Sequence, residues 1–276
     1  MKTSVLEQYK KRILDDKVVH ISEAADNKGE YTQPTPIGYP VFDEAMLGGV
    51  REGDLIIATG LSGHGKTTFL QNVSVNLSKK VFPSIWFSYE VVIDNLYAKF
   101  KEMGMKEEEN FFIYTPKRNT TGNLSWIKDK IREGLEKEAT KFVFIDHIDF
   151  LTPTTVKTTD QHRIVLRNIC QELKTIAIEL RIIIFLIAHV KKVQGREVEM
   201  QDIAESSGIY QNADFVFSVT RQYRKVLSGG KMIDILTDES ILKMLKNRIT
   251  GSCPYMNFTL KNNKIVPWML SPKDFK

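Results

Sequence analysis

One stretch near the start of the chain decides its fold, and it reads Gly60-Leu61-Ser62-Gly63-His64-Gly65-Lys66-Thr67. It matches the pattern G-x-x-x-x-G-K-[ST], in which glycines allow backbone N–H groups to turn inward onto phosphate oxygens. A predicted strand over residues 54–59 precedes the loop, and a predicted helix over residues 66–77 follows it and adds the positive end of its dipole. We expect this loop and Thr68 to bind ATP, with Lys66 on the β- and γ-phosphates and the Thr67 hydroxyl on Mg²⁺.

Outside the loop, short apolar runs alternate with amphipathic stretches. The apolar runs predict strands at residues 84–88, 111–114, 142–145 and 182–187, and the amphipathic stretches predict helices at residues 93–103, 124–139 and 163–180. Strands this apolar are covered on both faces, which is typical of a parallel sheet between helix layers. After Asp214 the helical patterns stop, and strands or hairpins are expected at residues 215–219, 233–236, 241–246 and 255–260. The sequence therefore predicts an α/β fold with a mostly parallel, twisted sheet and antiparallel strands at its C-terminal end.

Acidic residues at the ends of two predicted strands complete a hydrolytic site. Asp146 ends the apolar run 142–145 and is expected to hold Mg²⁺ together with Thr67. Hydrolysis also needs a group that orients or deprotonates water, and Glu90, just past the strand at 84–88, suits that role. Asp149 is the competing candidate, because it lies shortly after the Mg²⁺ carboxylate.

Composition and charge narrow the class of protein. The chain has 276 residues with 39 Lys and Arg against 34 Asp and Glu, and the net charge of +5 permits a polyanionic partner without requiring one. No apolar run reaches the roughly 18 residues of a membrane span, and the N-terminus lacks the apolar segment of a secretory signal. Two cysteines are too few for a disulfide scaffold. We therefore expect a cytoplasmic protein with no membrane partner.

Residues 1–32 differ from the rest of the chain. A stripe of apolar residues within Ser4 to Val18 predicts a helix, and the polar stretch 24–30 followed by Pro34 and Pro36 predicts a linker. We expect residues 1–32 to form a helical arm and linker and residues 33–276 to form the α/β domain. The arm either folds back on its own domain or docks on another subunit, because a helix of this length is marginal alone in water.

Further motifs follow in a fixed order along the chain. They are Trp86-Phe87-Ser88-Tyr89-Glu90, the stretch 36–54, the stretch 202–214 with its Gln211-Asn212-Ala213-Asp214 ending, and Lys246-Asn247-Arg248 with Gly251. A base on the strand after the phosphate-loop helix resembles the RecA-like P-loop ATPases, and the set resembles the C-terminal ATPase domain of DnaB-family replicative helicases over about residues 37–260. The likeness does not include the family's N-terminal helical-hairpin domain, for which we expect no counterpart in this sequence.

The resemblance implies roles for residues away from the phosphate loop. His189, where bacterial members carry Gln, is expected to sense the γ-phosphate. Lys246 and Arg248 stand two apart on a predicted strand, hence on one face, and are expected to reach the γ-phosphate in a neighbouring subunit. Single-stranded DNA is expected to contact basic side chains in two loops, namely Lys191, Lys192 and Arg196 in one and Lys157 in the other.

The resemblance also implies a function. The chain would be a helicase motor that hydrolyses ATP with Mg²⁺ at the subunit interfaces of a homo-oligomeric ring, expected to be a hexamer, and moves along single-stranded DNA. A primase or a helicase loader is the further partner that the family suggests. The alternative is a non-helicase ATPase of the same fold, similar to a recombinase or to a clock-protein-like regulator. A scaffold subunit without activity is disfavoured, because the residues expected to bind and hydrolyse ATP are all present.

Overall fold

A computed structural model of the chain describes residues 20 and 22 and the ranges 33–105, 113–115, 124–153, 155–156, 158–189, 207–229 and 231–268. The predicted arm, apart from residues 20 and 22, lies outside these ranges. The four predicted DNA-binding residues, Lys157, Lys191, Lys192 and Arg196, also lie outside them. The statements that follow concern the described residues.

These residues form one nine-stranded sheet in the order β3-β2-β4-β5-β1-β6-β7-β8-β9. The parallel part consists of β1 (Leu55–Gly60), β2 (Ser84–Ser88), β3 (Ile113–Tyr114), β4 (Phe142–Asp146), β5 (Ile183–His189) and β6 (Phe215–Ser228). The antiparallel part adds β7 (Lys231–Asn247), β8 (Tyr255–Lys261) and β9 (Lys264–Trp268). The predicted arrangement, a mostly parallel sheet with antiparallel C-terminal strands, is confirmed.

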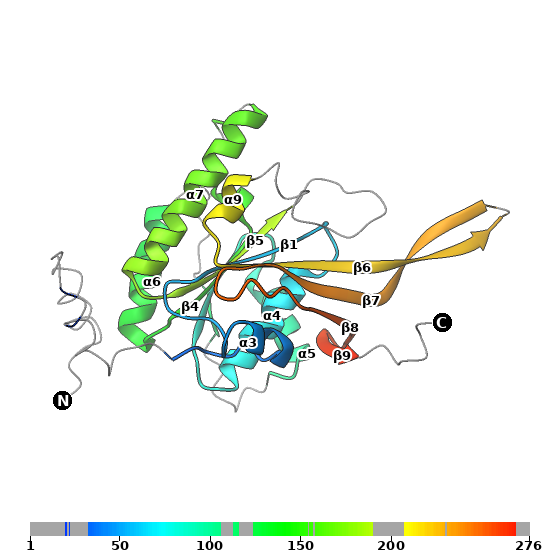
Figure 1. Ribbon diagram of the computed structural model, residues 1–276, viewed down its shortest axis with the longest axis horizontal. Helices are drawn as coiled ribbons and strands as arrows, with labels where there is room; N and C mark the ends of the chain where they lie inside the picture. Colours follow the sequence, from blue (N-terminus) through cyan, green and yellow to red (C-terminus); the bar gives the residue numbers. More distant parts are fainter. Residues whose placement is uncertain are drawn as a thin grey trace.

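Helices cover both faces of the parallel strands (Figure 1), which is why β1, β2, β4 and β5 are buried along almost their whole length. Leu55 and Ile57 of β1 belong to one core, which they share with α6 (Leu124–Glu138), α7 (Thr159–Glu179) and α9 (Ser207–Gln211). Ile56 and Ala58 point the other way, into a core with α3 (Pro40–Ala45), α4 (Lys66–Ser78) and α5 (Ile93–Glu102). The alternation of side chains along a strand thus divides one apolar run between two cores.

The structure differs from the predicted elements at several places: the strand predicted at 215–219 extends to Ser228, and helix α9 was not predicted. Helix α7 begins at Thr159 rather than at residue 163, because Thr158 and Gln161 form a capping box that starts the helix before its apolar face does. The predicted strands 233–236 and 241–246 are one strand, β7, which continues through polar residues between them. Helix α3 and strand β9 were not predicted. No helix among the described residues is long and apolar enough to span a membrane.

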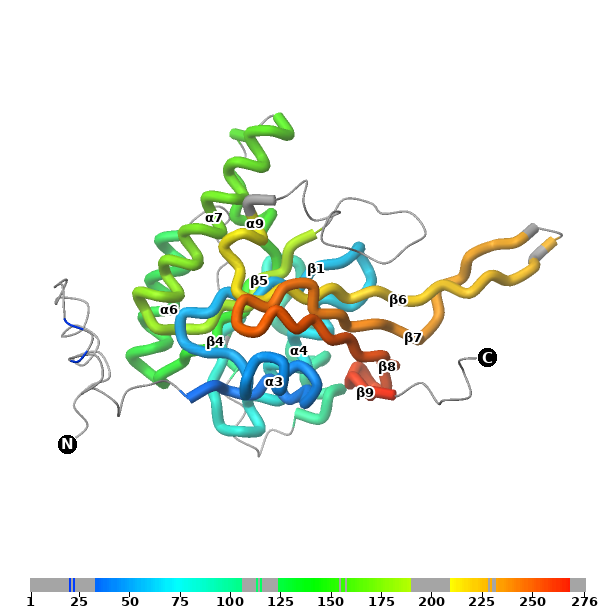
Figure 2. Tube along the Cα trace, viewed as in Figure 1, coloured from blue at the N-terminus to red at the C-terminus, as the bar shows by residue number. Residues whose placement is uncertain are grey.

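Strands β6 and β7 continue past the sheet as a two-stranded hairpin (Figure 2). Their pairing runs out to Ser228 and Lys231, whereas β8 pairs only with the Glu239–Lys243 part of β7. At its base the hairpin is fixed to the phosphate loop, since the backbone N–H of Arg221 donates to His64 Nδ1 at 3.1 Å. The Tyr223 hydroxyl lies 3.4 Å from His64 Nε2. The loop and the hairpin are therefore held together.

Candidate functional site

Four adjacent strands, β2, β4, β5 and β1, bring the candidate residues to one edge of the sheet. In the parallel register Gly60 stands beside His189, and Ser88 stands beside Asp146. A cavity of about 200 Å³ opens at these carboxyl ends, lined by Ser62, Gly63, Gly65, Lys66, Thr67, Thr68, Glu90, Asp146, Ile187 and His189. Ligands bind at this edge in open α/β sheets.

The phosphate loop connects β1 to α4. Gly60 has φ = 142°, and a Cβ there would lie 2.4 Å from the carbonyl oxygen of Val219, so only glycine fits beside β6. Gly65 has φ = 99° and leads directly into α4, whose first residues line the cavity and whose first N–H groups have no partner within the helix. Lys66 Nζ donates to the carbonyl oxygens of Gly60 at 3.0 Å and Leu61 at 2.9 Å, and burial lowers the pKa of Lys66 to about 8. Negative phosphate oxygens would favour the ammonium form of this side chain.

Thr67 and Asp146 form an oxygen-rich pair suited to Mg²⁺. The Thr67 hydroxyl donates to Asp146 Oδ2 at 2.8 Å, and the Asp146 side chain is buried. Within the described residues, Asp146 Oδ1 is buried without a hydrogen-bond partner. Burial, with a further contribution from Glu90, raises the pKa of Asp146, because a second negative group nearby disfavours ionisation. A divalent cation on these oxygens would satisfy the free atom and offset the repulsion, so the residues fit the expected metal.

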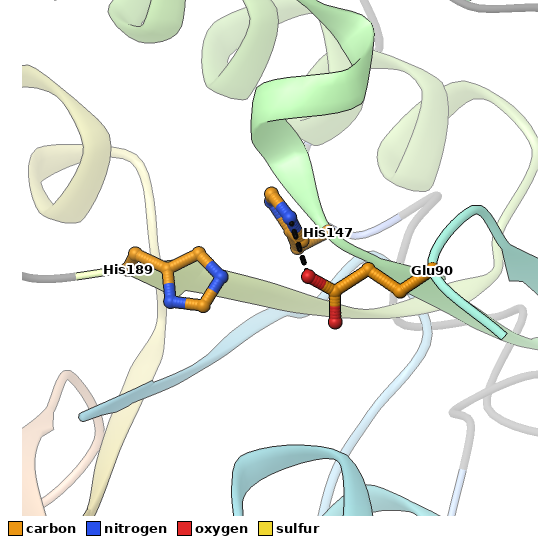
Figure 3. A group of neighbouring side chains, drawn as sticks. All are labelled: Glu90, His147 and His189. Carbon is orange, nitrogen blue, oxygen red and sulfur yellow. Dashed lines mark ion pairs between the residues drawn. The ribbon is translucent and has the colours of Figure 1, made fainter. Parts of the chain in front are cut away.

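Glu90 lies just past β2, with 43% of its side chain exposed, and it lines the cavity. Its Oε1 lies 3.0 Å from Nε2 of His147, and the His147 ring packs edge-on against His189 with centroids 4.4 Å apart (Figure 3). Burial and the nearby Lys66 lower the pKa of His189, which favours its neutral form. Three side chains from three neighbouring strand ends therefore meet beside the phosphate loop.

His147 was not identified from the sequence. The available signal was its position directly after the strand-ending Asp146, where its side chain must lie close to the cavity. The ligand atoms of Glu90, His147 and His189 all lie within 4.8 Å of one another. Two imidazoles and one carboxylate are a ligand set that suits zinc better than Mg²⁺. The ion pair of His147 with Glu90 and the ring contact with His189 already account for this proximity.

Asp149, the competing base, faces two histidines instead of the cavity. Its carboxylate is 3.1 Å from His147 Nδ1 and 3.7 Å from His162 Nε2, and it is not among the residues that line the cavity. Of the two candidate bases, Glu90 is therefore the one that lines the cavity.

Lys246 and Arg248 lie at the opposite edge of the sheet from the cavity. The prediction that both lie on one strand is wrong for Arg248, because β7 ends at Asn247 and Arg248 occupies the following turn. The two side chains nevertheless converge, since both donate to the carbonyl oxygen of Gln211, at 3.2 Å and 2.9 Å. Arg248 also pairs with Asp214, the residue before β6, at 3.1 Å.

That position separates Arg248 from the phosphate loop of its own chain. The backbone N–H of Leu55, at the start of β1, donates to Asp214 at 2.8 Å, whereas the phosphate loop follows the end of β1. The strand between them has six residues. At a rise of about 3.3 Å per residue this is a separation of about 20 Å, more than one arginine side chain spans. Arg248 therefore cannot reach the phosphate loop of its own chain.

Comparisons with known proteins place this geometry in a family. The chain is 26% identical over 247 residues to the replicative DNA helicase DnaC of Bacillus subtilis (strain 168), an alignment that covers 79% of the chain and 54% of the relative. It is 24% identical over 256 residues to the replicative DNA helicase DnaB of Geobacillus stearothermophilus, covering 82% of the chain and 56% of the relative. The chain thus spans about half the length of these curated relatives.

Solved structures agree on the fold. The ATPase domain of G40P superposes with a TM-score of 0.73 at 17% identity, covering 92% of this chain and all of that one. A DnaB-like replicative helicase superposes with a TM-score of 0.69 at 17% identity, covering 91% of this chain and 67% of that one. The predicted RecA-like fold is confirmed. The family described as DnaB-like helicase C terminal domain matches residues 97–261, and the chain belongs to that family.

Proposed function

We propose that this chain is an ATP-hydrolysing motor domain of a replicative-type DNA helicase, which works in a homo-oligomeric ring and moves along single-stranded DNA. The observation that supports it best is the convergence of Lys66, Thr67, Asp146 and Glu90 on one cavity at the carboxyl ends of adjacent strands. These are the groups that phosphoryl transfer from ATP to water requires. The curated relatives are named replicative DNA helicases, which supports DNA unwinding as the purpose of the hydrolysis.

In this proposal each group has one task. Backbone N–H groups of the phosphate loop and the Lys66 ammonium bind the phosphates, and Glu90 accepts the proton of the attacking water. Thr67 and Asp146 would hold Mg²⁺, which supplies positive charge against the phosphate oxygens when bound. In this proposal the imidazole of His189, on the strand beside the loop, donates to the γ-phosphate. The division of the chain into an arm, residues 1–32, and an ATPase domain, residues 33–276, is part of the same proposal.

The rival function is a nucleotide-driven ATPase of the same fold that does not unwind DNA. Strand displacement on a forked DNA substrate separates the two functions, with ATP and Mg²⁺ present. We expect displacement that stops when ATP is replaced by a non-hydrolysable analogue. ATP hydrolysis stimulated by single-stranded DNA but without displacement would favour the rival. One solved neighbour is described with its interactions with primase, so a primase is the partner to add in a second round.

If each ATP site is shared between two subunits, mixing two inactive variants should restore part of the ATPase activity. Arg248→Ala and Lys66→Ala chains should each be inactive alone, because an arginine finger contributes about 10³–10⁵ in rate and Lys66 binds the phosphates. Random mixing in equal amounts leaves about a quarter of head-to-tail interfaces with an intact loop on one side and an intact Arg248 on the other. We expect the rate of phosphate release in the mixture to rise toward a quarter of the wild-type rate. Activity equal to the sum of the two separate variants would contradict a shared site.

The residues predicted to contact DNA lie outside the described ranges. Their positive charge nevertheless predicts how DNA binding should depend on salt. Replacing Lys191, Lys192 and Arg196 with Ala should weaken binding of single-stranded DNA and flatten the slope of log K against log salt by about two units, since each lost phosphate contact removes roughly 0.7. Fluorescence anisotropy over a salt series measures this slope.

A charge-matched control comes from the solvated face of α6, where Lys128, Lys130 and Lys137 form ion pairs with acidic side chains. Replacing these three with Ala removes the same net charge and should leave the slope unchanged. Equal slopes for both triple variants would place the DNA contacts elsewhere, with Lys157 the next residue to replace.

A further inference from the structure

Glu90 needs a partner that fixes its direction. Its carboxylate is the end of a flexible side chain that is 43% exposed and follows β2 in a loop. A general base works only when the proton that it accepts is within hydrogen-bond reach. Within the described residues, the ion pair with His147 is the contact that holds this carboxylate.

His147 is itself fixed on several sides. Its side chain is only 10% exposed, and its Nδ1 accepts the backbone N–H of Asp149 at 3.3 Å and lies 3.1 Å from the Asp149 carboxylate. Its ring contacts Phe150, with centroids 4.7 Å apart, and His189. An imidazole anchored at Nδ1 presents Nε2 in one direction, and Figure 3 shows the Glu90 carboxylate on that side.

Nε2 of His147 and Oε1 of Glu90 lie 3.0 Å apart, within the range of an ion pair. A proton is present on Nε2 in the imidazolium and in the neutral tautomer whose Nδ1 accepts the backbone N–H of Asp149. In these two forms Nε2 holds Oε1, which leaves Oε2 as the oxygen free to accept another proton.

We propose that His147 is the positioning residue of Glu90, holding Oε1 so that Oε2 faces the water that attacks the γ-phosphate. The inference rests on the proposed ATP hydrolysis. In that step the water oxygen bonds to phosphorus while the bond between phosphorus and the ADP oxygen breaks, and the water proton passes to Oε2. His147 touches neither water nor nucleotide and acts through Glu90 alone.

Two substitutions at one position test this. In His147→Gln the side-chain amide NH₂ reaches about as far as Nε2 and still donates to Glu90, whereas in His147→Asn the amide ends near the Nδ1 position and falls short. With Mg²⁺ and single-stranded DNA, we expect His147→Asn to lower kcat by roughly 10–100-fold, below the ~10²–10⁴ of a lost general base. KM and the Kd for a fluorescent ATP analogue should change by less than about twofold, because the loss concerns the chemical step. His147→Gln should recover most of kcat.

A matched control and a double variant separate positioning from packing. His162→Asn removes an imidazole that faces the same Asp149 without reaching Glu90, and it should keep the wild-type kcat. Adding His147→Asn to Glu90→Gln should cost nothing further in kcat, because a residue that acts through Glu90 has no effect once the base is gone. Thermal unfolding of each variant reports whether the chain has folded.

Several results would overturn the inference. Equal losses of kcat in His147→Asn and His147→Gln would assign the residue to packing, as would a further loss in the double variant or a variant that fails to fold. A kcat that stays at the wild-type value in His147→Asn would remove any role. A wild-type chain without ATPase activity would contradict the proposed function itself and is recognised separately, because it fails before any variant is compared.

Discussion

Replacing Lys66 with Ala should reduce ATP hydrolysis to background, a loss of at least about 10²-fold. The Lys66 ammonium lies at the phosphate loop with two backbone carbonyls as its partners, and among the described residues that line the cavity there is no other lysine or arginine. Its loss should weaken both ATP binding and the stabilisation of charge in the transition state. Phosphate release and titration with a fluorescent ATP analogue measure the two effects.

The matched control for this variant is Lys79→Ala, which removes a lysine from the exposed end of the same helix. It should hydrolyse ATP like the wild type. Lys66→Ala should also remain folded, because burial lowers the pKa of Lys66, which means that the folded chain disfavours the charge that the variant removes. Hydrolysis at the wild-type rate in a folded Lys66→Ala chain would show that the cavity is not the ATP site.

Glu90→Gln should bind ATP and Mg²⁺ but hydrolyse them slowly, with kcat lower by about 10²–10⁴. The amide keeps the size of the side chain and an oxygen facing His147, but it cannot accept the proton of water. Single-turnover hydrolysis and nucleotide titration, compared in one preparation, separate the two properties. We expect the Kd for nucleotide to stay close to the wild-type value.

Asp149→Asn is the decisive comparison for Glu90→Gln. Asp149 lies outside the cavity lining, and Asn would keep an oxygen near His147, so most of the activity should remain. If Asp149→Asn abolishes hydrolysis while Glu90→Gln proceeds normally, the assignment of the base must be exchanged between the two carboxylates.

The parallel half of the fold could be predicted from the sequence because each strand is buried on both faces and reads as an uninterrupted apolar run. The β6–β7 hairpin could not. Tyr223 and Leu236 stand opposite each other in it and remain 49% and 40% exposed, so burial does not impose an alternating pattern there. Polar residues such as Thr237 and Asp238 then read as a break between two strands, and the pairing of β7 with β6 does shift register there before it resumes at Ser240.

The residues of the candidate site also differ in whether the sequence could predict them. Lys66 belongs to the phosphate-loop pattern, and Asp146 and Glu90 end or follow apolar strands, so local patterns could predict that these three residues meet at one cavity. His147 carries no pattern of its own, and its meaning arises only when β2 and β4 pair and bring it to Glu90. Arg248 was placed on a strand because the sequence does not mark where pairing ends, and β7 stops one residue earlier.

The strand order has a consequence for how the chain matures. Strand β1 lies between β5 and β6. It pairs with β5 on one side, where Leu55 stands opposite Ile184, and with β6 on the other, where Ile56 stands opposite Phe215. During synthesis, β2 and β4 can pair before β5 and β6 have been made. Strand β1 has no strand partner until then. Such non-local pairing slows folding and exposes the nascent chain to aggregation. The phosphate loop is thus synthesised early, but β5 and β6, the strands on either side of the strand that precedes it, are synthesised later.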